Sequence, residues 1–573
     1  MKKVLLITIT LLLITSINAQ DVAFINVNII PMDSERVLEE QTLLIKDGVI
    51  SEFGDSSIIK LPENAQIIDA NGSYIMPGIA DMHVHIRNAD ELVNYLAYGV
   101  TTVMHMGGTS NQGKNNLRLI KEIKQGKMIG PKIYTTERIF DGDPAAAGSA
   151  YKISDPALAV ELINELNTKG YDFIKLYNNI SRQVFNTIIK EANRLKLPVV
   201  GHVSRKFDPI DAINNGQDMI AHTEELFFTY FKGPRSTENY DKAFKPDLGL
   251  VPELVKSLKK NNVAIIPNLS YAFTDLIMWD DVNIILADPE IKYVAPILVR
   301  NEFISGNINR RSNIENFIHR DQKKYQLSSM LTYEFQKAGI LQLLGTDATQ
   351  AGLFPGKSVH RELTELVKTG LGNYEVLSIA TKNAGKFAVE NNLRNSNFGQ
   401  IIPGFIADMI LVEENPLDDI RNTKLIKGVI TNGRWISIEE IDERRSIIAS
   451  KYASINKIET MLKASLIDNS IETKMKELIH ENQNSTEILR TIESNINRIG
   501  YAFMAKKEIE KALEIFELNT KYFENSANAW DSYAEAHLSN NDKANAIKYY
   551  TKALEVNPNL NSAKQQLKLL NKD

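Results

Sequence analysis

The 573-residue chain contains no cysteine, which excludes both disulfide bonds and an anchor attached through a lipidated cysteine. Dense runs of lysine and arginine are also absent, and the formal net charge is −5, so nothing indicates a nucleic-acid-binding function. The residues that are present, 43% hydrophobic and 24% charged, are typical of globular proteins, and the length predicts two or three domains. We therefore expect a small-molecule or dipeptide-like partner.

A long apolar run stands at the N-terminus. Lys2 and Lys3 precede the apolar residues 4–14, and apart from Ile17 small or polar residues follow up to Ala19. This pattern predicts a signal peptide (residues 1–19) and a periplasmic or secreted protein with no membrane span after its removal. An uncleaved anchor is the alternative, although the run is shorter than the roughly 18 to 20 residues of a spanning helix.

Two segments that are distant in the sequence share a pattern typical of short strands and tight turns. Residues 20–74 alternate apolar and polar positions between Asp-Gly and Asn-Gly turns, and residues 397–437 repeat this pattern with a hairpin signal at Asn432-Gly433. We expect the two segments to form one small composite β-sandwich around an inserted domain.

The inserted residues 75–396 contain eight short, β-branched apolar runs, several of them separated by amphipathic segments such as 155–169 and 181–195. This alternation predicts an α/β fold, a (β/α)8 or TIM barrel, whose chemistry lies at the C-terminal ends of the strands. A doubly wound sheet is the alternative, but its glycine-rich phosphate motif is missing. Residues 226–262 and 272–330 would be loops or extra helices over the barrel mouth.

Residues 438–573 have a helical pattern throughout. Ile499 and Gly500 recur as Tyr533 and Ala534, a period of 34 residues that resembles the tetratricopeptide pattern, and we place two such repeats at about 493–560. Two repeats are fewer than a free-standing solenoid needs, which indicates a protein partner or self-association. An ordinary helical hairpin is the alternative.

The stretch MPGIADMHVHI (residues 76–86) places two histidines one residue apart. On a strand, His83 and His85 point to the same face and could bind one metal ion together, although two hydrogen-bonded histidines would give the same pattern. Other metal-compatible side chains stand near the ends of later predicted strands: Lys175, His202, His222 and Asp347. Each has an ordinary structural explanation, but six of them at equivalent strand ends indicate a shared metal site.

Several motifs, in order, resemble the amidohydrolase superfamily, in particular its imidazolonepropionase and prolidase-like branch. They are MPGIADMHVHI, GVTTVMHMGG, FIKLY, VVGHVS, IAHTEE and LLGTDA, with the closing stretch FGQIIPGFIADMILVEENPLDDI, and the resemblance covers about residues 21–435. It implies one divalent ion on His83 and His85 and a second on His202 and His222. Lys175, carboxylated by carbon dioxide, would bridge the ions, and Asp347 would bind the first ion and move the proton.

Four further residues near strand ends are candidates for substrate binding. Tyr177 and Tyr271 follow the predicted fourth and seventh strands, where they could donate hydrogen bonds or simply pack. His105 ends the predicted second strand, and His360 follows the eighth. We assign all four to substrate binding as a hypothesis.

The resulting hypothesis is an exported, metal-dependent amidohydrolase that cleaves a non-standard amide-like C–N bond with metal-activated hydroxide. Zn²⁺, as one or two ions, suits a set of imidazoles and carboxylates. A dipeptidase is the alternative within the enzymes, and a positive residue near the pocket would favour it. An inactive scaffold protein acting through its helical repeats is the alternative outside them.

Overall fold

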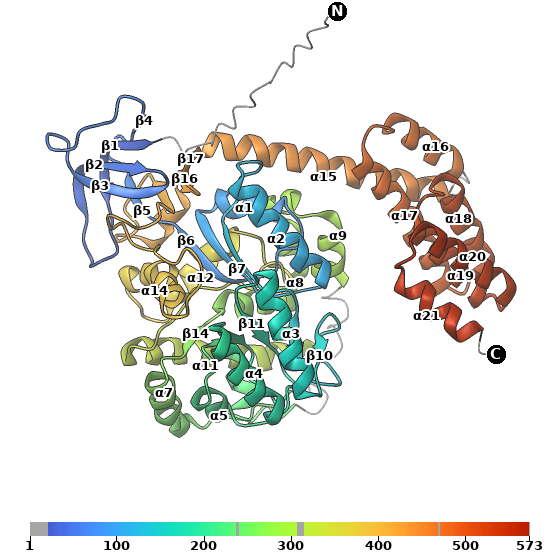
Figure 1. Cartoon of the computed structure of the whole chain (residues 1–573), viewed down its shortest axis with the longest axis horizontal. Coiled ribbons are helices and arrows are strands. Elements are labelled where there is room, and N and C mark those ends of the chain that lie inside the picture. Colours follow the sequence, from blue (N-terminus) through green and yellow to red (C-terminus); the bar gives the residue numbers. More distant parts are fainter. Residues whose placement is uncertain (1–20, 236–239, 306–313, 468–469, 572–573) are drawn as a thin grey trace, which may run out of the picture. The chain divides into compact units, whose positions relative to one another are not determined.

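The computed structural model describes residues 21–235, 240–305, 314–467 and 470–571. The predicted signal peptide therefore lies outside the described residues. The chain divides into two compact units, Met1–Ile448 and Ala449–Asp573, which are described separately below. Figure 1 shows the elements of both units.

Strands from both ends of the first unit pair in one eight-stranded sheet of order β17-β16-β15-β5-β1-β2-β3, with β4 beside β1. β5 joins the two segments, because it pairs parallel to β1 and antiparallel to β15. The strands are β1 (Val22–Ile29), β2 (Leu38–Lys46), β3 (Val49–Asp55), β4 (Gln66–Asp69), β5 (Tyr74–Pro77), β15 (Met409–Val412), β16 (Ile426–Thr431) and β17 (Arg434–Ser437). The chain thus leaves the sheet after Pro77 and returns beside the same strand at Met409.

The (β/α)8 barrel is confirmed, with its strands arranged in chain order. Seven regular parallel strands are β6 (Ile79–Val84), β7 (Val100–His105), β8 (Lys132–Thr135), β11 (Ile174–Leu176), β12 (Val199–Gly201), β13 (Met219–Ala221) and β14 (Ala264–Ile266). Residues 341–348 take the eighth position, since Gln342 bridges to Ile265 and Ala348 bridges to Val84, both in parallel. Two short strands that the sequence did not predict, β9 (Ile139–Asp141) and β10 (Tyr151–Lys152), extend the edge between β8 and β11.

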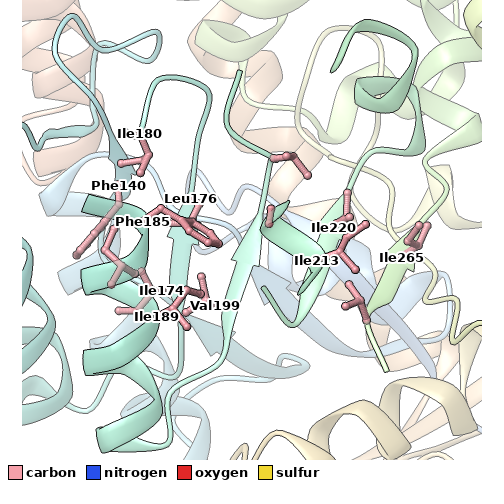
Figure 2. Packing of buried hydrophobic residues seen from close by; sticks show 14 of the residues in the cluster. Phe140, Ile174, Leu176, Ile180, Phe185, Ile189, Val199, Ile213, Ile220 and Ile265 are labelled. Atoms are coloured by element: carbon pink, nitrogen blue, oxygen red, sulfur yellow. The ribbon is translucent and has the colours of Figure 1, made fainter. Parts of the chain in front are cut away.

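Helices cover the barrel because their apolar residues recur on one face. In α4 (Arg182–Leu195), Val184, Phe185, Ile188, Ile189 and Ala192 are buried, and the Ser181 hydroxyl accepts a hydrogen bond from the Val184 N–H at the N-terminus. Figure 2 shows this face packing on side chains from β11 and β12. The other barrel helices are α1 (Glu91–Ala97), α2 (Ser110–Lys124), α3 (Pro156–Lys169), α5 (Pro209–Asn214), α7 (Val251–Lys260), α12 (Lys357–Lys368), α13 (Asn373–Ala380) and α14 (Lys382–Glu390).

The two long excursions are largely helical. The first contains α6 (Thr223–Thr229) and the short helix η1 (Leu248–Leu250) before α7. The second contains α8 (Leu269–Leu286), η2 (Pro289–Tyr293), α9 (Pro296–Leu298), η3 (Val299–Ser305) and α11 (Ile314–Ala338), while η4 (Ile420–Lys424) lies later in the chain. A buried ion pair joins α11 to α6, because Lys324 Nζ lies 2.8 Å from Glu224 Oε2. Asp321, on the same helix as Lys324, lies 3.1 Å from Nζ through its Oδ1.

The second unit is made of helical hairpins. Gly500 lets two helices approach closely, since a Cβ atom there would stand 2.6 Å from the ring of Phe516. The helices are α15 (Ile438–Ile467), which begins in the first unit, α16 (Ile471–Glu481), α17 (Thr486–Ala505), α18 (Ile509–Tyr522), α19 (Ala527–Ser539), α20 (Lys543–Val556) and α21 (Asn561–Leu570). Within the described residues, no helix has the length and apolar character needed to cross a membrane.

Candidate metal centre

Five of the predicted side chains converge at the C-terminal ends of the barrel strands. Oδ1 of Asp347 lies 3.3 Å from Nε2 of His83 and 3.0 Å from Nε2 of His85, and Oδ2 of Asp347 lies 3.7 Å from Nε2 of His222. The ring of His202 is centred 4.9 Å from the ring of His222. Donor atoms of His83, His222 and Asp347 all lie within 4.8 Å of one another, which is close enough for one cation to contact all three.

Backbone hydrogen bonds between β6 and residues 341–348 hold the two sides of this centre in register. The Asp347 N–H donates to the His83 carbonyl at 2.7 Å, and the His85 N–H donates to the Ala348 carbonyl at 2.5 Å. His222 and Asp347 both have a φ of 65°, in the left-handed region that side chains other than glycine seldom occupy. Such backbone strain concentrates at functional sites, where the surrounding structure enforces it.

Two of the four imidazoles are oriented by a hydrogen bond at Nδ1. His85 Nδ1 donates to the Gly107 carbonyl at 2.8 Å, and His202 Nδ1 donates to Oδ1 of Asn178 at 2.9 Å. In each ring the lone pair of Nε2 is then free for another partner. His83 and His222 differ, because the Nδ1 atom of each is buried and makes no hydrogen bond within the described residues.

Three of the imidazoles, those of His83, His202 and His222, are held in the neutral form that metal binding requires. Burial lowers the pKa of His222 to about 4. Burial, followed by the positive charge of Lys175, lowers the pKa of His83 and of His202 well below the ordinary value. Burial alone would raise the pKa of Asp347, but the neighbouring His83 and His85 outweigh it and keep the carboxylate ionised. Neutral imidazoles beside an ionised carboxylate are a donor set that fits a divalent metal such as zinc.

Lys175 supplies the clearest sign that the centre is built for an additional group. Its side chain is 1% exposed, and its Nζ is buried without a hydrogen-bond partner among the described residues. Burial lowers its pKa to about 8, so about a tenth of the amine is uncharged at pH 7. A buried amine without a partner is costly unless something else binds it.

These side chains open into a cavity of about 320 Å³ whose walls are mostly polar. Tyr177 and Tyr271 both line it, as their predicted role in substrate binding requires. The ring of Tyr177 lies 4.2 Å from the ring of His202, and burial raises the pKa of Tyr177 to about 12. Its phenol therefore stays protonated and can donate a hydrogen bond into the cavity.

The structure does not support the same role for the other two histidines. His105 does not line the cavity, and its Nδ1 accepts a hydrogen bond from the Ile86 N–H at 3.0 Å. His360 is a wrong prediction: it stands on α12, with Nε2 3.2 Å from the Tyr98 carbonyl and Nδ1 3.0 Å from the Thr423 hydroxyl. Both of its nitrogens thus have partners within the protein scaffold, away from the cavity.

Sequence reasoning missed three charged residues of the cavity wall. Arg87 lies two residues beyond His85, and Glu224 and Glu225 follow His222 on α6. Both carboxylates form ion pairs: Glu224 lies 2.8 Å from Lys324, and Glu225 lies 3.0 Å from Arg205. The sequence did offer one signal for them, because they stand next to predicted ligands in the stretches HVHIR and AHTEE.

A parallel barrel with histidines and a carboxylate at its strand ends defines the class of metal-dependent barrel hydrolases. Residues 74–436 match the model of the amidohydrolase family, and the chain belongs to that family. It is a hydrolase whose relatives act on amide or other C–N bonds.

Relatives of this family match over very different lengths. Ochratoxinase of Aspergillus niger is 24% identical over 429 residues, which cover 69% of this chain and 81% of the ochratoxinase. Enamidase of Eubacterium barkeri is 33% identical over 87 residues, only 14% of this chain and 22% of the enamidase. Among solved structures, a bottromycin amidohydrolase superposes with a TM-score of 0.58 at 20% identity, over 75% of this chain and 90% of that protein.

The second unit has a match of its own. Residues 527–560, which comprise α19 and α20, match the tetratricopeptide repeat model. The later of the two predicted repeats is therefore confirmed. The earlier one, formed by α17 and α18, stays a prediction.

Proposed function

We propose that this chain hydrolyses an amide-like C–N bond of a small, polar molecule in the barrel cavity, with zinc as one or two ions. The observation that carries the proposal is the convergence of His83, His85, His222 and Asp347 around one point. The same cavity contains the buried amine of Lys175, which has no hydrogen-bond partner in the part of the chain that the structure describes. A bound divalent ion would lower the pKa of water and polarise the substrate carbonyl.

Lys175 would act as a bridging anion rather than as a cation. Its uncharged amine nitrogen can bond to the carbon of carbon dioxide and lose a proton, which leaves a carbamate with one negative charge. Burial favours this reaction because it depresses the pKa of the amine to about 8. Formation of the carbamate would also remove the cost of burying an amine that has no hydrogen-bond partner among the described residues.

In this proposal, Asp347 would be the residue that moves protons. Its two oxygens face three imidazoles, and its side chain lines the cavity, so it can reach both an attacking water and a leaving nitrogen. We infer that it takes a proton from the water and gives a proton to the departing amine. Tyr177 would hold the substrate by donating a hydrogen bond from its protonated phenol.

A dipeptidase is the second candidate, and the cavity wall favours it. Arg87 stands beyond the end of β6, and Glu224 and Glu225 stand beyond the end of β13, which is three strands away around the barrel. A substrate with a free carboxylate at one end and a free amine at the other would match this separation of charge. Dipeptides and, for the carboxylate alone, N-acyl amino acids meet this description.

One screen tests both candidates. The zinc-loaded enzyme would be incubated with dipeptides, N-acyl amino acids and lactams, and the released amine would be measured. We expect turnover of at least one carboxylate-bearing class and none by the Asp347→Asn variant. Equal release by the two proteins would contradict the proposal, and turnover of lactams alone would reject the dipeptidase.

We also propose export, on the charged and then apolar pattern of residues 1–19. Expression of the full chain in a bacterial host, followed by fractionation and N-terminal sequencing, tests this. A mature N-terminus at Gln20 in the periplasmic fraction is the expected result. An intact N-terminus in the cytoplasm would contradict it.

A further inference from the structure

A groove in the helical unit combines aromatic rings with carboxylates. It has a volume of about 490 Å³, and its walls come from α16, α18, α19 and α20. We call it the aromatic groove; its residues are Glu472, Glu514, Glu517, Leu518, Thr520, Lys521, Trp530, Tyr533 and Tyr549.

The aromatic side of the groove is a continuous stack. The rings of Trp530 and Tyr549 are nearly parallel, at 19° with centroids 5.8 Å apart, and the ring of Tyr533 is centred 4.5 Å from that of Tyr549. Trp530 and Tyr549 are only half-buried, so part of this stack faces the groove. The faces of such rings attract cations.

The charged side of the groove is negative. Glu472 is already paired with Lys521 at 2.9 Å, so the one lysine in the wall is compensated. Glu514 and Glu517, one helical turn apart on α18, are exposed and form no ion pair among the residues that the structure describes. Two uncompensated carboxylates therefore face an aromatic wall.

We propose that the aromatic groove binds a lysine or arginine side chain carried by a segment of a partner protein. The aliphatic stem of such a side chain would lie along the stack formed by Trp530 and Tyr549, and its charged end would lie between Glu514 and Glu517. The match of residues 527–560 to a tetratricopeptide repeat supports a protein as the occupant. This inference does not depend on the barrel chemistry.

Fluorine NMR of the full chain labelled with 5-fluorotryptophan provides the test. The chain has three tryptophans, so the label gives three resonances, and the Trp530→Phe variant identifies the one from the groove. Acetyl-Lys-Lys-Lys-amide is the probe, and acetyl-Glu-Glu-Glu-amide of equal length is its control. We expect the lysine peptide alone to shift the Trp530 resonance, with weaker binding at higher salt.

Removal of the two carboxylates sharpens the test. Glu514→Gln/Glu517→Gln should weaken binding of the lysine peptide roughly tenfold, because each exposed ion pair contributes a few-fold. Glu524→Gln/Glu555→Gln changes the net charge equally at exposed sites outside the groove and should leave the affinity within about twofold. An unmoved Trp530 resonance, an equal response to the glutamate peptide, or equal losses in both double variants would overturn the proposal.

Discussion

The ionisable side chains of the metal centre in the barrel cavity are buried, whereas carboxylates of the aromatic groove in the helical unit are exposed. In the cavity, the ionisable groups are buried and only 3.0 to 3.7 Å apart, and burial keeps several of them neutral. In the groove, the side chains of Glu514 and Glu517 are exposed to water. Burying a polar group costs free energy, and its interactions with neighbouring groups are strong there. Interactions between exposed charges are weak and are screened by salt. Substitutions in the cavity should therefore change activity more than substitutions in the groove change binding.

The largest effect is expected from Asp347→Asn, because the amide cannot accept and release the proton that the reaction moves. We expect kcat to fall by about 10² to 10⁴-fold with little change in the unfolding temperature. Steady-state kinetics on a substrate from the screen, together with a thermal melt, measure this. Glu161→Gln, on the exposed face of α3, is the control and should behave as the wild type. Kinetics of the Asp347→Asn enzyme equal to that control would refute the assignment.

Lys175→Ala should have the next largest effect, because it removes the only bridging anion proposed for the centre. We expect metal content, measured by mass spectrometry of the purified protein, to fall by at least half. Added acetate or propionate should restore part of the metal and part of the activity, since a small carboxylate can enter the space that the side chain leaves. Lys175→Met, which refills this space without a charge, should not be rescued. Unchanged metal content in both variants would contradict the proposed bridging role of Lys175.

Arg87→Met should mainly affect binding of substrates with a free carboxylate. A charge-assisted hydrogen bond contributes about 1.5 to 3 kcal/mol, so KM should rise by roughly 10 to 100-fold for such substrates. The same substrates with an amidated C-terminus should show no difference between variant and wild type. A uniform loss on both substrate forms would mean that Arg87 serves the fold rather than the carboxylate.

The smallest expected effect concerns stability in acid. Burial lowers the pKa of His360 to about 3, so below pH 6.5 the unfolded chain binds a proton that the folded chain does not. Its contribution to the free energy of unfolding is complete above pH 6.5 and falls by up to about 1.4 kcal/mol per pH unit toward pH 3. Urea unfolding of the metal-free protein at pH 5 and pH 7 measures this. His360→Gln should show a shallower pH dependence, and an identical slope would contradict the burial of a neutral ring.

Periodicity predicted the barrel and the strand ends at which the candidate ligands stand, because both follow from strand geometry. Side chains at the C-terminal ends of parallel strands reach the same edge of the sheet regardless of the loops, which is why His83 and His202 could be predicted to lie close together. His105 also ends a strand, β7, but it does not line the cavity. His360 was misplaced because it stands on a helix after a loop, and no strand end fixes where it points. The eighth strand was predicted as regular, but residues 341–348 form only isolated bridges.

The wall residues were harder to predict because they depend on contacts that are distant in sequence. Glu224 reaches the cavity wall with a partner, Lys324, that lies 100 residues further along the chain on α11. Glu225 is likewise paired with Arg205, which lies in the loop after β12. Ion pairs between distant residues produce no periodic pattern in the sequence, so they can be identified only in the folded structure.

The central claim is that six side chains bind metal at one point of the barrel. Anomalous diffraction at the zinc absorption edge, from crystals of the zinc-loaded protein, tests it most directly. The account predicts one or two strong peaks in the cavity, within bonding distance of His83, His85, Lys175, His202, His222 and Asp347. An empty cavity in zinc-saturated crystals, or peaks found only at surface residues, would contradict it.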